Sequence, residues 1–238
     1  MALSMLLSNS SYLEPEEFGA LTFDISFETA QFRKHLLKMY RDTYLMPLPS
    51  TIAGMVGAIF GIRRRILKGF VSERKILAGV AMLGFEGLIN EVAILVKMKK
   101  RRELIRTPVK NVILFRPKYR IAVTSKDDSF LGELKERLVK LDFEFEIYGG
   151  NDYNFVSWIG KPREARLSLS SEGEGICKLD DLESIEGSGT LYMDDVNDGE
   201  VSRYAFGLDI SMRTMRPLPV VEDGEHKIFV HDPSKFLR

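Results

Sequence analysis

Apolar residues along this chain follow two patterns, alternation with polar residues and a spacing of three and four. The first pattern predicts strands, and the second predicts two helices between them. Residues 21–27 alternate and are rich in β-forming side chains, so we expect a first strand there. Apolar residues are spaced three and four apart in residues 50–65 and again in 127–141, the spacing of helices that bury one face. Residues 76–83 and 87–96 have an extended or mixed pattern. The other expected strands are residues 91–96, 109–114, 119–124 and 143–148.

These elements follow the order strand, helix, strand, strand, helix, strand, which is the ferredoxin-like arrangement. We therefore predict an α+β fold with one such domain over residues 1–157. Beyond residue 158 the periodicity weakens, and short β-like segments alternate with Gly, Asp and Asn. This pattern predicts a small β-rich C-terminal region over residues 158–238, with β-like segments at 189–193, 204–209 and 227–230.

The charge of the chain is balanced overall but unevenly distributed. The chain has 34 Lys and Arg residues against 34 Asp and Glu residues, so the net charge gives no sign of a nucleic-acid partner. Basic residues are dense between the two middle strands, however, where an inserted hairpin at about residues 97–118 would present them to phosphate groups. The simpler interpretation of such a run is a solvated face. The basic residues are Lys97, Lys99, Lys100, Arg101, Arg102, Arg106, Lys110, Arg116, Lys118 and Arg120.

Other features of the sequence predict a soluble, cytoplasmic protein with no metal or cofactor. The single cysteine, Cys177, excludes an internal disulfide and a multi-cysteine metal site. We expect no signal peptide and no membrane span, because the apolar runs fall short of the roughly 20 residues of a membrane helix. His226 and His231 have a spacing that suits metal ligands, but no third ligand is evident, so we assign no metal.

The stretch over residues 41–61 combines an ordered loop with a helix start. Pro47 and Pro49 hold the preceding residues extended, after which Ser50 or Thr51 is expected to cap a helix. The N–H groups of such a helix start, beside two hydroxyls, form a site for a phosphate or another anion. Glycines at positions 54, 57 and 61, with Ala58, leave a second helix face smooth, where a backbone of protein or nucleic acid can approach closely. The alternative is that these glycines only permit tight packing of the helix on the sheet.

Several motifs in this chain resemble the signature of CRISPR-associated protein family five, in the RAMP superfamily. The run from Tyr44 to Thr51 is the most specific part of the resemblance, which covers roughly the first two thirds of the chain. The supporting motifs are Phe32-Arg33-Lys34, Gly54 with Gly57, Phe115 to Arg120, and the glycine turn from Tyr148 to Tyr153.

The resemblance implies a non-catalytic, RNA-binding subunit of a type I CRISPR Cascade surveillance complex, with an archaeal type I-A system favoured. Such a subunit has a ferredoxin-like (RRM/RAMP) domain, grips the 5′ handle of the CRISPR RNA (crRNA) and caps the backbone filament in antiviral defence. Its implied partners are the crRNA, the Cascade backbone subunit and the large subunit, and it meets target DNA only through the complex. The candidate RNA-binding residues are Arg33, Lys34, His35, Tyr44, Ser50 and Thr51, together with the ten basic residues from Lys97 to Arg120 named above.

Two other functions remain open at this point. One branch of the family is a metal-independent endoribonuclease that processes CRISPR repeat RNA, and His35, Tyr44 and a hairpin lysine would be its acid and base groups. That branch resembles a pattern with a lysine–histidine pair after the hairpin. This chain has no histidine between His35 and His226, which favours the non-catalytic role. The second alternative is a general RNA-recognition module without preference for a CRISPR handle.

Overall fold

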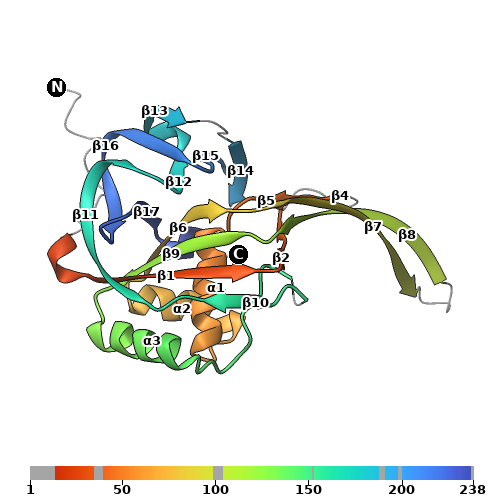
Figure 1. Ribbon diagram of the computed structural model, residues 1–238, viewed down its shortest axis with the longest axis horizontal. Coiled ribbons are helices and arrows are strands. Elements are labelled where there is room, and N and C mark those ends of the chain that lie inside the picture. Colours follow the sequence, from red (N-terminus) through yellow and green to blue (C-terminus); the bar gives the residue numbers. More distant parts are fainter. Residues whose placement is uncertain are drawn as a thin grey trace.

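The computed structural model describes residues 14–34, 40–98, 104–151, 153–187, 191–197 and 200–236, which fold into a mixed structure that is mostly β (Figure 1). In this part of the chain the α-helices are α1 (Pro49–Ile59), α2 (Arg64–Glu73) and α3 (Asp128–Lys140), and single 3-10 turns occur at Pro15–Glu17, Leu179–Asp181 and Pro233–Phe236. The strands are β1 (Gly19–Phe27), β2 (Thr29–Ala30), β3 (Phe32–Arg33), β4 (Tyr40–Arg41), β5 (Thr43–Tyr44), β6 (Leu77–Gly84), β7 (Gly87–Met98), β8 (Leu104–Phe115), β9 (Lys118–Ser125), β10 (Val156–Ile159), β11 (Arg163–Gly173), β12 (Ile176–Lys178), β13 (Leu182–Gly187), β14 (Leu191–Asn197), β15 (Glu200–Phe206), β16 (Ile210–Glu222) and β17 (Lys227–His231).

The central sheet has the antiparallel order β10, β1, β9, β6, and α1, α2 and α3 cover one of its faces (Figure 1). The largest buried cluster joins the two layers, with Phe23 and Ile121 of the sheet in the same core as Ile52 and Leu134 of the helices. The expected order of strand, helix, strand, strand, helix, strand is therefore present. Its second strand, however, is β6 and not residues 91–96, which belong to β7.

The C-terminal strands close this sheet into a ring. β11 pairs with the first half of β1, β16 pairs with β11, β17 pairs with β16, and β17 also pairs with β6. The strands β1, β9, β6, β17, β16 and β11 thus form a closed antiparallel ring, in which each strand has a neighbour on both sides. The sheet runs across the expected boundary between residues 157 and 158, and that division stays a prediction. Side chains from all six strands meet in one buried cluster inside the ring, which contains Ala20, Ala81, Ala122, Leu167, Val221, Ile228 and Val230.

A two-stranded arm, made of β7 and β8, projects from this body (Figure 1). The two strands pair from Gly87 and Phe115 at the base to Met98 and Leu104 towards the tip. The inserted hairpin is therefore real, but it starts about ten residues before the expected position 97. At its base, β8 is also paired with the short strands β2 and β4, which fasten the arm to the end of β1.

The expected helix over residues 50–65 is wrong in its limits. Helix α1 begins at Pro49 with Leu48 as the preceding cap residue, and no side-chain hydrogen bond caps it, so neither Ser50 nor Thr51 has that role. Proline is well suited to a first turn because the N–H that it lacks would have no partner there. After α1, Gly61 takes a left-handed conformation with φ of +68°, and the chain restarts as α2.

The expected strand over residues 143–148 is also absent from the described structure. The N–H groups of Glu144 and Phe145 donate to the carbonyl oxygens of Ile59 and Ala58, at 3.3 and 3.0 Å. This segment therefore satisfies the C-terminal carbonyl groups of α1, which have no partner within the helix. The fourth strand of the sheet is β10, further along the chain.

Candidate nucleic-acid interface

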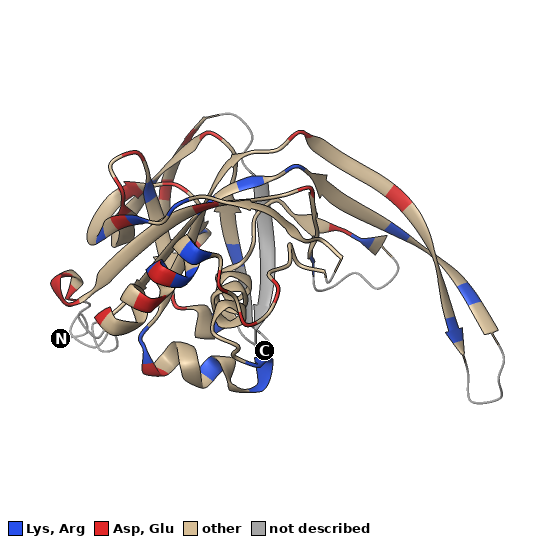
Figure 2. Cartoon of the chain, turned by 60° about the horizontal axis from the view of Figure 1, so that its bottom comes forward, with Lys and Arg blue, Asp and Glu red and all other residues tan. Residues whose placement is uncertain are grey.

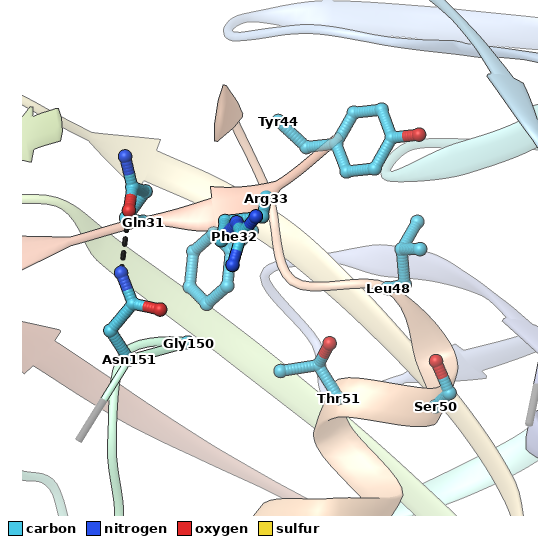
Figure 3. Close-up of a pocket in the computed structure, with 9 residues that line it drawn as sticks. All are labelled: Gln31, Phe32, Arg33, Tyr44, Leu48, Ser50, Thr51, Gly150 and Asn151. Carbon is cyan, nitrogen blue, oxygen red and sulfur yellow. Dashed lines mark hydrogen bonds between the residues drawn. The ribbon is translucent and has the colours of Figure 1, made fainter. Parts of the chain in front are cut away.

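A small pocket lies where the chain leaves β1, between the β3–β5 pair and the start of α1 (Figure 3). Its volume of about 150 Å³ is below the ~300–1,000 Å³ of typical pockets for drug-sized ligands, so its size suits a single phosphate or part of a nucleotide. The residues that line it are Gln31, Phe32, Arg33, Tyr44, Leu48, Ser50, Thr51, Gly150 and Asn151.

The glycine turn forms one wall of the pocket and is fitted tightly against Gln31. The Gln31 N–H donates to the Gly149 carbonyl oxygen at 2.8 Å, and the Asn151 amide donates to the Gln31 side-chain oxygen (Figure 3). Gly150 has φ of +95°, and a Cβ there would lie 2.0 Å from the Gln31 carbonyl oxygen. Only glycine fits this position, so the turn has a structural reason to carry it.

Gln31 connects the pocket to the base of the arm. Its side chain is 1% exposed, and its amide nitrogen donates to the carbonyl oxygens of Arg41 in β4 and Val112 in β8, at 3.1 and 3.0 Å. One buried side chain therefore bonds to the glycine turn, to β4 and to the arm. The sequence pattern did not single out Gln31 or Asn151, although Asn151 falls in the glycine turn that carries part of the family resemblance.

The start of α1 supplies the helix side of the pocket. The N–H groups of Thr51 and Ile52 both donate to the Leu48 carbonyl oxygen, at 2.8 and 3.0 Å. The Ser50 and Thr51 hydroxyls lie beside this first turn, and the positive end of the helix dipole favours an anion there. The glycines of α1 are expected from the sequence to admit another backbone or to pack closely on the sheet. A Cβ at Gly57 would lie 2.8 Å from Leu67, so this glycine permits close packing against helix α2 and not against the sheet, whereas nothing lies within 4 Å of a Cβ at Gly54.

The candidate residues after β1 differ in their exposure. Arg33 is exposed at the pocket, and no acidic side chain of the described residues forms an ion pair with it. Lys34 is half-buried and paired with Asp42, so part of its charge is already compensated. Tyr44 is only 3% exposed, which leaves no open ring face for a base to stack on. His35 lies outside the described residues.

The arm combines basic residues with an exposed apolar face. Figure 2 shows that its charged positions are mostly Lys and Arg, and among the described residues Lys97, Arg106 and Lys110 are exposed and in no ion pair. Lys99, Lys100, Arg101 and Arg102 fall outside the described part. The pairing of β7 with β8 puts Arg106 and Lys110 on one face with five apolar side chains that are 54–71% exposed, namely Val92, Ile94, Val96, Met98 and Leu104.

Of the three basic candidates nearest the sheet, only Lys118 is exposed without an ion pair to a described acidic residue. Arg116 is bound by Glu28 and Glu86. Arg120 is 3% exposed, and its guanidinium donates to Asp24 at 2.8 Å, to Asp223 at 3.1 Å and to Glu225 at 2.6 Å. We therefore correct the expectation for Arg120: its donors are used inside the ring, where a phosphate group does not reach them.

Two buried titratable side chains, Tyr119 and Cys177, are stabilised in their protonated forms. Burial raises the pKa of the Tyr119 hydroxyl well above its ordinary value, and that hydroxyl donates to the Leu45 carbonyl oxygen at 2.6 Å. Burial also raises the pKa of the Cys177 thiol to about 12, so the thiolate is scarce at neutral pH. Within the described residues no group of three or more His, Cys, Asp or Glu side chains is placed to hold a metal ion, and no helix is long and apolar enough to cross a membrane.

Two solved structures that are similar to this chain carry CRISPR-related descriptions. A solved structure described as "CRISPR RNA-guided surveillance complex" superposes with a TM-score of 0.50 over 83% of this chain and 91% of that chain, at 12% identity. Another, "Crystal Structure of CRISPR-associated Protein", matches over 90% of this chain and 92% of that chain at 11% identity, with a TM-score of 0.38. No curated protein sequence matches the chain.

The family-model comparison covers just over half of the chain. The model for "CRISPR-associated protein (Cas_Cas5)" matches residues 20–144, a segment that includes all of β1 but its first residue, the start of α1 and the whole arm. The chain therefore belongs to the CRISPR-associated Cas5 family.

Proposed function

We propose that this chain is a non-catalytic, RNA-binding subunit of a type I CRISPR Cascade complex, which grips the 5′ handle of the crRNA and caps the backbone filament. One observation carries the proposal: the family match includes the arm and seven of the nine residues that line the pocket, and Gln31 bonds both to the arm and to the glycine turn that completes the pocket. RNA held at the pocket would therefore lie near the arm. We also assign β1, β6, β9 and β10, with their helices, to the ferredoxin-like class, because the strand order β10, β1, β9, β6 suits it.

The contacts available at the pocket suit a bent single strand of RNA. Arg33 offers a cation to a phosphate, and the start of α1 offers the Ser50 and Thr51 hydroxyls, while Asn151 offers its side-chain oxygen to a base or a ribose. Lys97, Arg106 and Lys110 would continue the phosphate contacts along the arm. Phosphate contacts position the RNA backbone but do not read its sequence. A preference for the handle therefore requires the polar groups of the pocket that can contact a base.

The apolar face of the arm supports a protein contact in the same complex. Five large apolar side chains exposed on a two-stranded hairpin form a continuous surface that water solvates poorly. We assign this face to the neighbouring backbone subunit. The large subunit and target DNA remain predicted partners by family membership and by the acidic character of the later part of the chain.

The test is binding and cleavage of a labelled RNA that carries a CRISPR 5′ handle, compared with a scrambled handle, with chelator present and salt varied. We expect salt-sensitive binding that prefers the handle, without cleavage. Arg33→Ala should weaken handle binding and reduce the salt slope by about 1, whereas Arg166→Ala, an exposed arginine on β11, should leave both unchanged.

The same test decides between this proposal and its alternatives. Metal-independent cleavage at one position would favour the endoribonuclease, with His35 and Tyr44 as the first residues to replace. Equal binding of both RNAs would favour a general RNA-recognition module. If the isolated chain binds neither RNA, the assay is repeated with the backbone subunit present, and the proposal fails if handle preference is then still absent.

A further inference from the structure

The central sheet has an open area on the face opposite the helices. The first half of β1 pairs with β11 inside the ring, whereas its second half pairs with β10, which is not a ring strand. At this end, Trp158 of β10 and Lys118 of β9 both pair with Ser26 of β1. These three residues therefore form a row across three strands, on the face that points away from α1, α2 and α3.

Trp158 is fixed on this face and yet half-exposed. Its side chain is 48% exposed, and a Cβ at Gly160 would lie 2.9 Å from the six-membered part of the indole ring. The ring therefore lies against the sheet in space that only a glycine leaves free. A register shift between Ser26 and Phe27 also brings Ser157 close, with its hydroxyl 3.1 Å from that of Ser26. Such bulges re-aim side chains and are frequent beside functional sites.

One cation lies on this ring, and two more follow it in the chain. The Lys118 ammonium lies 5.2 Å from the centre of the Trp158 ring, within the range of a cation–π contact. Lys161 is exposed just beyond Gly160, and Arg163 follows on β11, paired with Glu225 at 3.2 Å. An aromatic face beside exposed lysines is the combination that binds single-stranded nucleic acid, because a base stacks on the ring and the cations bind the phosphates.

A purely structural role explains less of what is seen. An apolar side chain at position 158 would also shield the buried pair of Asp24 and Arg120, but shielding requires neither a half-exposed indole nor a lysine on its ring. The position also suits an RNA strand that occupies the pocket. Ser26 is five residues before Gln31, so the two sites are at most about 18 Å apart along the chain.

We infer that Trp158, assisted by Lys118, is a stacking site for an unpaired nucleobase of a single-stranded nucleic acid. The inference rests on the proposed function, since it places a second contact for a bound strand outside the handle pocket. RNA and single-stranded DNA share the required chemistry, and the experiment separates them.

Trp158 is the single tryptophan of the chain, so its fluorescence reports on this site alone. The full-length protein is titrated with the handle RNA, with oligo-uridine and oligo-deoxyuridine of equal length, and with tripolyphosphate, which has charge but no base. We expect quenching by the oligonucleotides and none by tripolyphosphate. Because oligo-uridine and oligo-deoxyuridine differ only in the sugar, the stronger of their two responses shows whether the site prefers RNA or DNA. Absence of quenching by all three oligonucleotides would overturn the inference.

Four variants, measured with labelled oligonucleotides, separate stacking from charge. Trp158→Leu keeps an apolar side chain and should weaken binding by about 5- to 100-fold, whereas Trp158→Phe keeps a ring and should stay within about threefold. Lys118→Gln should reduce the salt slope by about 1. The control is Val139→Ala, which alters an exposed apolar residue of α3 on the other side of the sheet and should have no effect.

The outcomes distinguish this inference from the proposed function. If the handle is preferred but Trp158→Leu binds as the native protein does, the stacking site is wrong and the proposed function stands. If Trp158→Leu loses affinity for all sequences and the handle is not preferred, the stacking site stands and the handle-binding role fails.

Discussion

The ring and the arm are both antiparallel β-structure, but they bury their side chains in opposite ways. In the ring, every strand has two neighbours, and alanine and branched aliphatic side chains from all six strands fill one interior. In the arm, β7 has one partner strand, and its large apolar side chains face outward. The ring can therefore be stable within this chain, whereas the outer arm has no core of its own. We conclude that the ring provides a core within the chain, whereas the apolar face of the arm stays open to solvent.

The largest expected effect is the loss of the cation inside the ring. Arg120→Met would leave Asp24 and Asp223 buried without their guanidinium partner, and removing one side of such a buried network costs about 3–5 kcal/mol. Urea unfolding followed by circular dichroism measures this loss. The control is Lys110→Met on the arm, which should change the free energy of unfolding by less than about 0.5 kcal/mol. Equal losses in the two variants would remove the distinction between ring and arm.

A pair of glycines tests the same contrast by packing alone. A Cβ at Gly79 would lie 2.2 Å from the Phe229 carbonyl oxygen, where β6 meets β17 and the ring closes, so Gly79→Ala should cost about 1–3 kcal/mol or more. Gly87 is at the base of the arm, and nothing lies within 4 Å of a Cβ there. We expect Gly87→Ala to stay within about 0.5 kcal/mol of the native protein in the same unfolding measurement. A stable Gly79→Ala variant would show that the ring does not close between these strands.

A smaller effect concerns His231, at the end of β17. Burial lowers the pKa of its imidazole below the ordinary 6.5, and its Nε2–H donates to the Ile176 carbonyl oxygen at 2.7 Å. Below pH 6.5 the His231 imidazole is protonated in the unfolded chain but still neutral in the folded protein. The free energy of unfolding therefore falls as the pH drops from 6.5 towards the folded pKa. His231→Gln keeps a donor but does not titrate. Between pH 7.5 and 5.5, in steps of about 0.5, the native protein should lose stability more steeply than this variant, by up to about 1.4 kcal/mol per pH unit. Parallel curves would contradict the assignment.

The sequence pattern correctly predicted elements that depend mainly on neighbouring residues. Helix α3 is an example: the expected segment 127–141 contains it, and the Asp127 side chain accepts a hydrogen bond from the Phe130 N–H at 3.0 Å as a cap. The ring could not be predicted in this way. Its closure depends on Gly79 meeting Phe229, residues 150 positions apart, and no local periodicity contains that information.

The candidate site was predictable to a similar degree. Arg33, Ser50 and Thr51, which two separate motifs of the family resemblance contain, line one pocket, and their contact with RNA stays a prediction. Arg120 was misassigned because a basic residue in a strand looks the same whether its partner is a phosphate or a buried carboxylate. Trp158 was overlooked because its environment comes from β1 and β9, which are more than 30 residues away in the sequence.

The last prediction removes the apolar face of the arm without removing the arm. In the double variant Val92→Thr and Ile94→Thr, both residues stay β-branched, so the hairpin is retained while two exposed apolar groups become polar. The free energy of unfolding should change by less than about 0.5 kcal/mol, because these side chains are 63% and 66% exposed in the isolated chain. Co-purification with the backbone subunit and crRNA should nevertheless fall strongly.

A matched variant, Val139→Thr on α3, alters a similarly exposed apolar residue and should co-purify normally. If the arm variant also assembles normally, its apolar face is not the contact with the backbone subunit; if it unfolds more easily, the arm contributes to the fold itself.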